Sequence, residues 1–157
     1  MGEFYIAAAG EADNDFFFTV EFQTTWDSLS AADRARLSPA QVREALHATH
    51  EQLLSRPGNR IYIARDAEGR RAGLLWLGVH RNLVSGQDEF WVYNITVQPE
   101  FRRQGLARHL LGLAEDLARQ EGYDALGLMV AEHNAAARAL YERVGFRTTN
   151  LLMRKSL

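Results

Sequence analysis

The feature that most constrains this chain is a long apolar run that ends near a proline and passes into an amphipathic segment. Residues 90–97 read Phe-Trp-Val-Tyr-Asn-Ile-Thr-Val, and this mixture of aromatic and β-branched residues predicts a strand. Pro99 follows, and a proline has no N–H with which to continue a ladder. Beyond Gln104 the apolar residues recur at helical spacing on one face: Leu106, Leu110, Leu113, Ala114 and Leu117. A strand that leads directly into such a helix indicates a sheet covered by helices.

The rest of the chain supplies further elements of both kinds. We expect strands at residues 4–9, 60–65, 72–79, 125–130 and 147–155. We expect helix within residues 11–37, after the capping box Ser38-Pro39-Ala40-Gln41, and from Asn134 to Val144. Strands come first and then alternate with helices, which predicts an α/β or α+β domain with a mixed sheet.

Length and composition narrow the function. The 157 residues are the size of one domain, so we expect a single domain over residues 1–157. The net charge of -2 favours neither a nucleic acid nor an anionic membrane as a partner. The chain has no cysteine, which excludes disulfides, thiolate metal sites and a cysteine nucleophile. A chain without disulfides fits a reducing cytosol, so we expect a cytoplasmic protein. No apolar stretch approaches the ~20 residues that span a bilayer.

The loop after the long strand is a candidate anion site. The first N–H groups of a helix have no partners within it, and the helix dipole adds partial positive charge there. Gly105 and Ala107 are small enough for a ligand to approach the backbone, and three arginines surround the turn: Arg102, Arg103 and Arg108. A phosphate or pyrophosphate suits such a turn. In the alternative interpretation the small residues only pack and the arginines are solvated. The loop is neither a Walker loop nor a G-x-G-x-x-G fingerprint.

Two segments resemble the signatures of the GNAT acetyltransferase family. Arg102-x-x-Gly105-x-Ala107 is similar to the family's Q/R-x-x-G-x-G/A. Residues 134–146 resemble its second signature, N-x-x-A-x-x-L-Y-E-x-x-G-F. Their order and spacing match as well, and the resemblance covers residues 60–157, with the N-terminal third similar only in its order of elements. One motif alone is a weak signal, whereas the two together are specific.

The resemblance implies the GNAT fold, a mixed twisted sheet with helices on both faces, and direct transfer of acetyl from acetyl-CoA to a primary amine of a small molecule or a protein. It implies no metal, and it leaves a homodimer open. In the family the pantetheine arm binds the strand backbone, here Ile95, Thr96 and Val97, in a gap beside the strand at 125–130. The pyrophosphate binds the turn, here Arg102, Arg103, Gln104, Gly105, Leu106, Ala107 and Arg108. Asn134 then contacts the cofactor arm, and Tyr141 lies near the thioester sulfur.

These roles fit the chemistry of acyl transfer. The reaction needs a neutral amine, a stabilised oxyanion and a proton for the leaving thiolate. A tyrosine, with a pKa of about 10, is protonated at neutral pH and can supply that proton. The N–H of Val97 is a candidate oxyanion donor. Without the motif, Tyr141 reads as a core aromatic and Asn134 as a helix cap.

The general base is left open. Relatives that acetylate ribosomal-protein N-termini place a glutamate where this chain has Met129, which weakens the case for a peptide N-terminus as acceptor. Other candidates, each also consistent with a solvated surface position, are Glu89, Glu100, Glu132 and His133. Deprotonation through water is an equal alternative. We expect the N-terminal third and the loop at 81–87 to select the acceptor.

Two further interpretations remain. The segment His47-Ala48-Thr49-His50-Glu51 differs in order from the zinc motif H-E-x-x-H, so we interpret it as a solvated helix face. The chain as a whole has an alternative from another class, a catalytically silent acyl-CoA-binding sensor, which would keep the phosphate turn without turnover. A plain interaction domain is disfavoured by the paired motifs.

Overall fold

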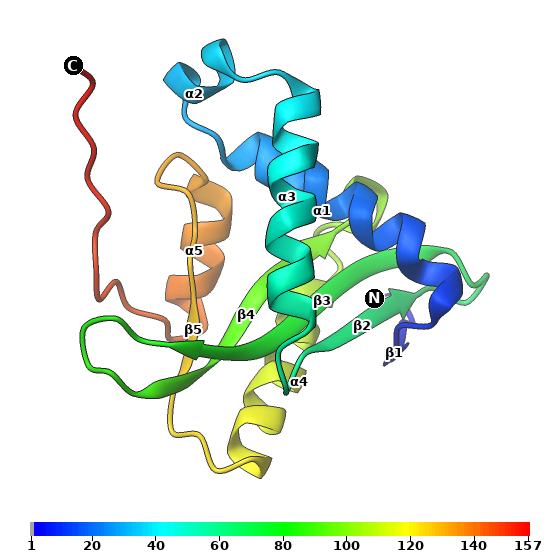
Figure 1. Ribbon diagram of the computed structural model, residues 1–157. Coiled ribbons are helices and arrows are strands. Elements are labelled where there is room, and N and C mark those ends of the chain that lie inside the picture. The colour runs from blue at the N-terminus through cyan, green and yellow to red at the C-terminus, as the bar shows by residue number, and fades with distance from the viewer. Residues whose placement is uncertain (1) are drawn as a thin grey trace.

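A five-stranded mixed sheet lies at the centre of the computed structural model, which describes residues 2–157 (Figure 1). The strands are β1 (Tyr5–Ala8), β2 (Arg60–Arg65), β3 (Arg71–Arg81), β4 (Asp88–Val97) and β5 (Leu126–Leu128). They lie in chain order, with β1 to β4 antiparallel and β5 parallel to β4. The helices are α1 (Asn14–Ser28), α2 (Ala31–Arg36), α3 (Pro39–Leu54), α4 (Leu106–Gln120) and α5 (Ala135–Arg143), with 3-10 turns η1 (Glu11–Asp13) and η2 (Pro99–Phe101).

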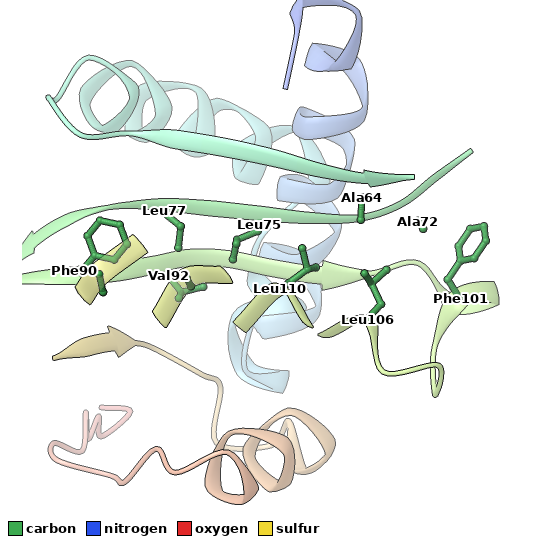
Figure 2. Close-up of a cluster of buried hydrophobic side chains, with 11 residues drawn as sticks. Ala64, Ala72, Leu75, Leu77, Phe90, Val92, Phe101, Leu106 and Leu110 are labelled. Carbon is green, nitrogen blue, oxygen red and sulfur yellow. The ribbon is translucent and has the colours of Figure 1, made fainter. Parts of the chain in front are cut away.

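Helices cover both faces of the sheet, as expected. On one face α4 packs its apolar stripe, including Leu106 and Leu110, against the buried side chains of β3 and β4 (Figure 2). On the other face α1 and α3 cover a second cluster that contains Phe17, Ile63 and Trp76. Because β3 is buried from both sides, its central residues are apolar without alternation.

A β-bulge in β4 changes which face its side chains occupy. Trp76 of β3 pairs with Asn94, whereas the next residue, Leu77, pairs with Val92, so Tyr93 is the extra residue. A bulge re-aims the side chains beyond it. Val92 therefore packs with the α4 cluster, while Asn94 contacts residues of α1 on the opposite face.

Most expected elements are confirmed, and the capping box at Ser38 forms as its sequence predicts. The region 11–37 is helical in two pieces, α1 and α2. The expected strand at 125–130 is shorter, because only residues 126–128 pair with β4.

The expected final strand at residues 147–155 is wrong. These residues have no regular structure and run as an extended segment past α5 (Figure 1). Leu151, Leu152 and Met153 are more than three-quarters exposed. A strand needs a paired edge, and within the described residues the sheet ends at the three-residue β5.

Within residues 2–157 no helix is both long and apolar enough to cross a membrane.

A buried carboxylate fastens the N-terminal elements to the sheet. Asp13 is 3% exposed and accepts hydrogen bonds from the Gly10 N–H at 3.0 Å, from Arg65 at 2.5 Å and from Arg71 at 2.7 Å. Burial alone would raise the pKa of Asp13, but the bonds from Arg71, Gly10 and Arg65 outweigh it and lower the pKa to about 2.

We predict that Asp13→Asn destabilises the fold at neutral pH by roughly 2 kcal/mol, because a charge-assisted contact with two arginines is lost. The folded-state pKa lies below the unfolded value of 3.8, so this contribution is complete above about pH 4 and disappears as the pH falls through 2. Urea unfolding at pH 7 and pH 2.5 measures it. An equal stability difference at both pH values would contradict the prediction.

Candidate functional site

The sheet opens on one side of β4. One edge of β4 pairs with β3 as far as Val97. The opposite edge pairs with β5 only from Phe90 to Val92, and beyond Val92 this edge is open. The N–H of Gln98 donates to Ala72 of β3 at 2.8 Å, so by alternation the backbone groups of Ile95 and Val97 point away from β3, into the opening. Such a free strand edge is a template for an extended polar chain.

A close contact holds the short seam between β4 and β5. Trp91 pairs with Gly127, and a Cβ on Gly127 would come within 2.3 Å of the indole ring. Beyond Leu128 the chain leaves β4, and Met129 is 82% exposed. The two strands therefore separate directly after the seam.

The turn that follows β4 has the backbone of an anion site. Arg103 has φ +64° and Gly105 has φ +84°, both in the left-handed region. Gly105 is the N-cap of α4 and supplies no side-chain cap. The first α-helical bond runs from the N–H of His109 to the carbonyl of Gly105, which leaves the earlier N–H groups of α4 for a ligand.

The side chains of the turn divide into three kinds. Arg102, Arg103 and Arg108 are exposed, and within residues 2–157 none of the three pairs with a carboxylate. Arg102 donates from Nε to the carbonyl of Val97 at 3.1 Å, so it connects the turn to the free strand edge. Gln104 and Ala107 are half-buried, and Leu106 is a core residue at 2% exposure. Only the backbone of Leu106 is therefore available to a ligand.

Helix α5 follows β5 through residues 129–134 and lies on the β5 side of the opening (Figure 1). Asn134 caps it by accepting from the N–H of Ala137 at 3.2 Å, which confirms its capping role. At the other end the N–H of Phe146 donates to the carbonyl of Tyr141 at 2.9 Å, and the two rings pack edge to face at 5.8 Å. Tyr141 is half-buried, and burial raises the pKa of its hydroxyl above the ordinary value of 10.

The residues considered as a general base have different surroundings. Glu89 accepts from Asn82 at 2.7 Å in the hairpin between β3 and β4. Glu132 is 93% exposed, and Glu100 is exposed as well. His133 lies 2.8 Å from the carbonyl of Asp27, and because a carbonyl only accepts, its Nε2 carries the proton. His133 thus links the end of α1 to the loop before α5.

A buried acid–histidine pair was missed by the sequence analysis. His50 is 4% exposed and bonds Glu21 at 3.0 Å, so the interpretation of residues 47–51 as a solvated face is wrong for His50. It holds for His47 and Glu51, which are each about three-quarters exposed. A signal existed, since His50 lies four residues after Leu46 and three before Leu53 on the apolar face of α3. Within residues 2–157 no three potential metal ligands gather.

Comparison with known proteins places this geometry in a family. YdgE of Bacillus subtilis (strain 168), an uncharacterized N-acetyltransferase, is 37% identical over 90 residues, which are 57% of this chain and 56% of that protein. The [ribosomal protein bS18]-alanine N-acetyltransferase of Escherichia coli (strain K12) is 44% identical over 64 residues, 41% of this chain and 43% of that protein. This chain therefore matches about half the length of each of these two relatives.

A solved structure shares the fold. The aminoglycoside N-acetyltransferase AAC(6')-Iy in complex with CoA superposes with a TM-score of 0.71 at 16% identity, over 100% of this chain and 96% of that one. The sequence profile described as "Acetyltransferase (GNAT) family" matches residues 22–146. The chain belongs to the GNAT acetyltransferase family.

Proposed function

We propose that this protein is an N-acetyltransferase that moves an acetyl group from acetyl-CoA to a primary amine. One observation carries the proposal: two features follow each other along the chain. The first is the edge of β4 at Ile95 and Val97 that β5 leaves unpaired, and the second is the uncapped, left-handed turn at Gly105 that begins α4. An extended ligand with amide groups at one end of its length and a pyrophosphate at the other matches this sequence of features.

The proposed path of the ligand follows from the layers of the fold. The pyrophosphate is held by N–H groups at the start of α4, with Arg102, Arg103 and Arg108 around it. The pantetheine arm then runs along β4, where backbone groups of Ile95 and Val97 face the opening. The expected backbone contact at Thr96 is not retained, because Thr96 pairs with Leu74 of β3. Because α4 lies on one face of the sheet, a ligand that passes through the opening presents its acetyl end toward the face covered by α1.

In the proposed reaction a neutral amine attacks the thioester carbonyl directly and forms the C–N bond, and the surplus proton on its nitrogen passes to water. The N–H of Val97 faces the opening and is the proposed donor to the oxyanion. The collapse of the tetrahedral intermediate breaks the C–S bond, and the hydroxyl of Tyr141 gives its proton to the leaving sulfur. The raised pKa of Tyr141 keeps that proton in place across the neutral and mildly alkaline range.

We propose a small-molecule or protein amine as the acceptor. Among the relatives, one is named for an aminoglycoside and another for an alanine of a ribosomal protein, so the family accommodates both classes. Met129 stands where relatives that acetylate peptide N-termini carry a glutamate, and it is exposed, so a peptide N-terminus is the less favoured acceptor here. We also propose that the chain forms a single domain and that the protein is cytoplasmic.

Thermal unfolding in the presence of acetyl-CoA, CoA and NAD at equal concentration tests the cofactor. A ligand that binds only the folded protein raises its melting temperature, and at about one hundred times the dissociation constant the gain is roughly 2.7 kcal/mol. We expect acetyl-CoA and CoA to stabilise the protein and NAD to leave the melting temperature unchanged. Equal response to all three, or to none, would contradict the proposed site.

Substitution at the turn should reduce cofactor affinity. Gly105→Val places a β-branched residue at φ +84°, which costs on the order of 1–3 kcal/mol and distorts the N–H groups of the turn. We expect the dissociation constant of CoA to rise at least about tenfold by calorimetry. Arg81→Ala, on the distant hairpin, is the matched control and should bind as the wild type does. Unchanged affinity in Gly105→Val would remove the turn from the site.

Replacement of the proposed acid should affect turnover and spare binding. Tyr141→Phe keeps the ring contact with Phe146 and removes only the hydroxyl, so we expect kcat to fall by about 100-fold or more while the CoA dissociation constant stays within about twofold. Release of free thiol from acetyl-CoA, assayed with an amine panel, measures turnover. A variant with full turnover would refute the acid role, and a wild type that binds acetyl-CoA without turnover would support the silent-sensor alternative.

A further inference from the structure

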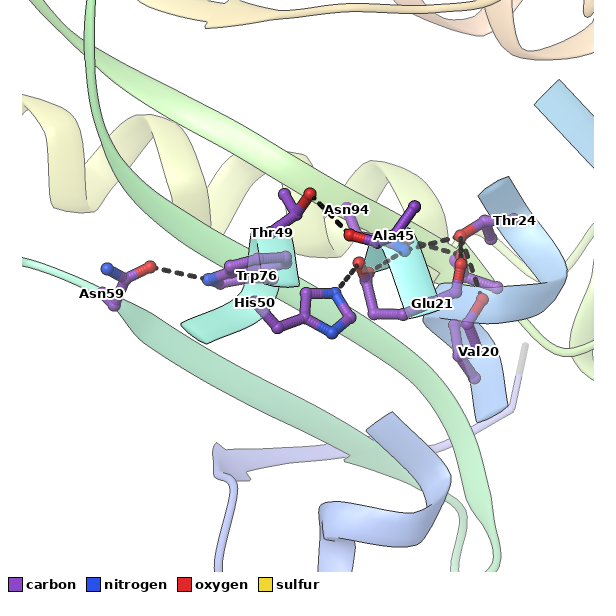
Figure 3. A network of polar contacts seen from close by, with 10 residues as sticks. Val20, Glu21, Thr24, Ala45, Thr49, His50, Asn59, Trp76 and Asn94 are labelled. Carbon is purple, nitrogen blue, oxygen red and sulfur yellow. Dashed lines mark hydrogen bonds and ion pairs between the residues drawn. The ribbon is translucent and has the colours of Figure 1, made fainter. Parts of the chain in front are cut away.

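A chain of buried hydrogen bonds connects α1, α3 and β4 (Figure 3). Glu21 of α1 is its centre: one carboxylate oxygen accepts from His50 Nε2 at 3.0 Å and the other accepts from the carboxamide of Asn94. The same carboxamide nitrogen donates to Thr24 Oγ1 at 2.9 Å, and Asn94 Oδ1 accepts from the hydroxyl of Thr96 at 2.7 Å. Glu21, His50 and Asn94 are each no more than 9% exposed.

The imidazole at the start of this chain is held in a fixed orientation. Its ring centre lies 5.4 Å from that of Phe17, 5.5 Å from that of Phe18 and 5.6 Å from that of Trp76. Trp76 is itself fixed by a 2.8 Å bond from its indole N–H to Asn59. Aromatic packing therefore fixes the orientation of the His50 ring. The hydrogen bonds then fix the side chains of Glu21, Asn94 and Thr96 in turn.

The end of the chain lies beside the proposed acetyl site. The bulge in β4 turns Asn94 to the face covered by α1, and Asn94 immediately precedes Ile95, whose backbone points into the opening. Thr96 lies between Ile95 and Val97, the two residues whose backbone N–H groups face the opening. The hydrogen-bonded chain thus fixes the backbone of β4 where the proposed thioester must bind, on the side from which the amine arrives.

Stability alone is a weak reason for this arrangement. A buried polar pair often adds nothing over apolar residues of similar volume, because both groups lose their hydration. Here the carboxylate joins two helices to one strand residue at an irregular point of the ladder. A β-bulge leaves its extra residue unpaired and disrupts the ladder locally. The contact from Glu21 to Asn94 supports the strand at this point.

We propose that Glu21 and His50 are positioning residues for acetyl transfer, which hold Asn94 and the bulge of β4 so that the thioester carbonyl meets the backbone N–H groups at the opening. This inference rests on the proposed function. Neither residue touches the reacting atoms, and both act through Asn94 and Thr96. Because the phosphate turn begins α4, which packs on the opposite face of the sheet, we expect loss of the pair to leave the turn unchanged.

Four variants test the proposal. Glu21→Ala removes both contacts of the carboxylate, whereas Glu21→Gln keeps an oxygen for Asn94 and is the conservative rescue. Thr96→Val removes only the hydroxyl that bonds Asn94, and it leaves the buried pair intact should Glu21→Ala fail to fold. His47→Ala, an exposed histidine on the same helix as His50, is the matched control.

The measurement uses acetyl-CoA labelled with carbon-13 at the thioester carbonyl. Isotope-edited infrared spectra report the hydrogen bonding of the bound carbonyl without need of an acceptor. We expect one narrow, downshifted band in the wild type, His47→Ala and Glu21→Gln. In Glu21→Ala and Thr96→Val we expect a broader band shifted toward that of free acetyl-CoA, with the dissociation constant within about twofold. For an amine that the wild type acetylates, kcat should fall about tenfold in these two variants.

The outcomes distinguish a failure of the proposed function from a failure of the positioning role. A wild type that fails to bind acetyl-CoA refutes the proposed function itself. Normal binding with the wild-type band and kcat in both Glu21→Ala and Thr96→Val refutes the positioning role, even where the melting temperature falls. A Glu21→Gln variant as impaired as Glu21→Ala would also overturn it, because the hydrogen bond to Asn94 would then be irrelevant.

Discussion

The structure depends on the unequal pairing of β4. One side of this strand is bonded to β3 along its length, and the other side is bonded to β5 for three residues only. Backbone N–H and C=O groups need partners, so the remaining edge is either solvated or occupied by a ligand. Pro99 ends the ladder directly beyond this edge and begins the turn into α4. The free edge and the anion turn are therefore consecutive in sequence and adjacent in space.

The two faces of the sheet differ in the side chains that they bury. The face under α4 is apolar, and there Leu106 and Leu110 fasten the helix whose first N–H groups form the turn. The opposite face combines the aromatic cluster around Trp76 with the buried chain of polar groups centred on Glu21. The bulge in β4 makes this division possible, because it moves Asn94 from the apolar layer to the polar one.

Prediction from the sequence succeeded where the signal was local. The caps at Ser38 and Asn134 formed as expected, since a cap depends on a side chain and an N–H three residues away. The strand at residues 90–97 was also predicted from a local signal, its run of aromatic and β-branched residues, and the turn after it from Pro99 and Gly105. The strand expected at 147–155 was wrong, because a strand depends on a distant partner edge that no local pattern specifies.

The sequence by itself determined the elements around the site, the arginine-rich turn with Gly105, and the two signatures that indicate the family. Only the tertiary structure decided that β4 and β5 separate after Val92, and that Glu21 and His50 meet although they are 29 residues apart in the sequence. A contact between α1, α3 and a bulged strand depends on three elements at once, and no spacing within one of them encodes it.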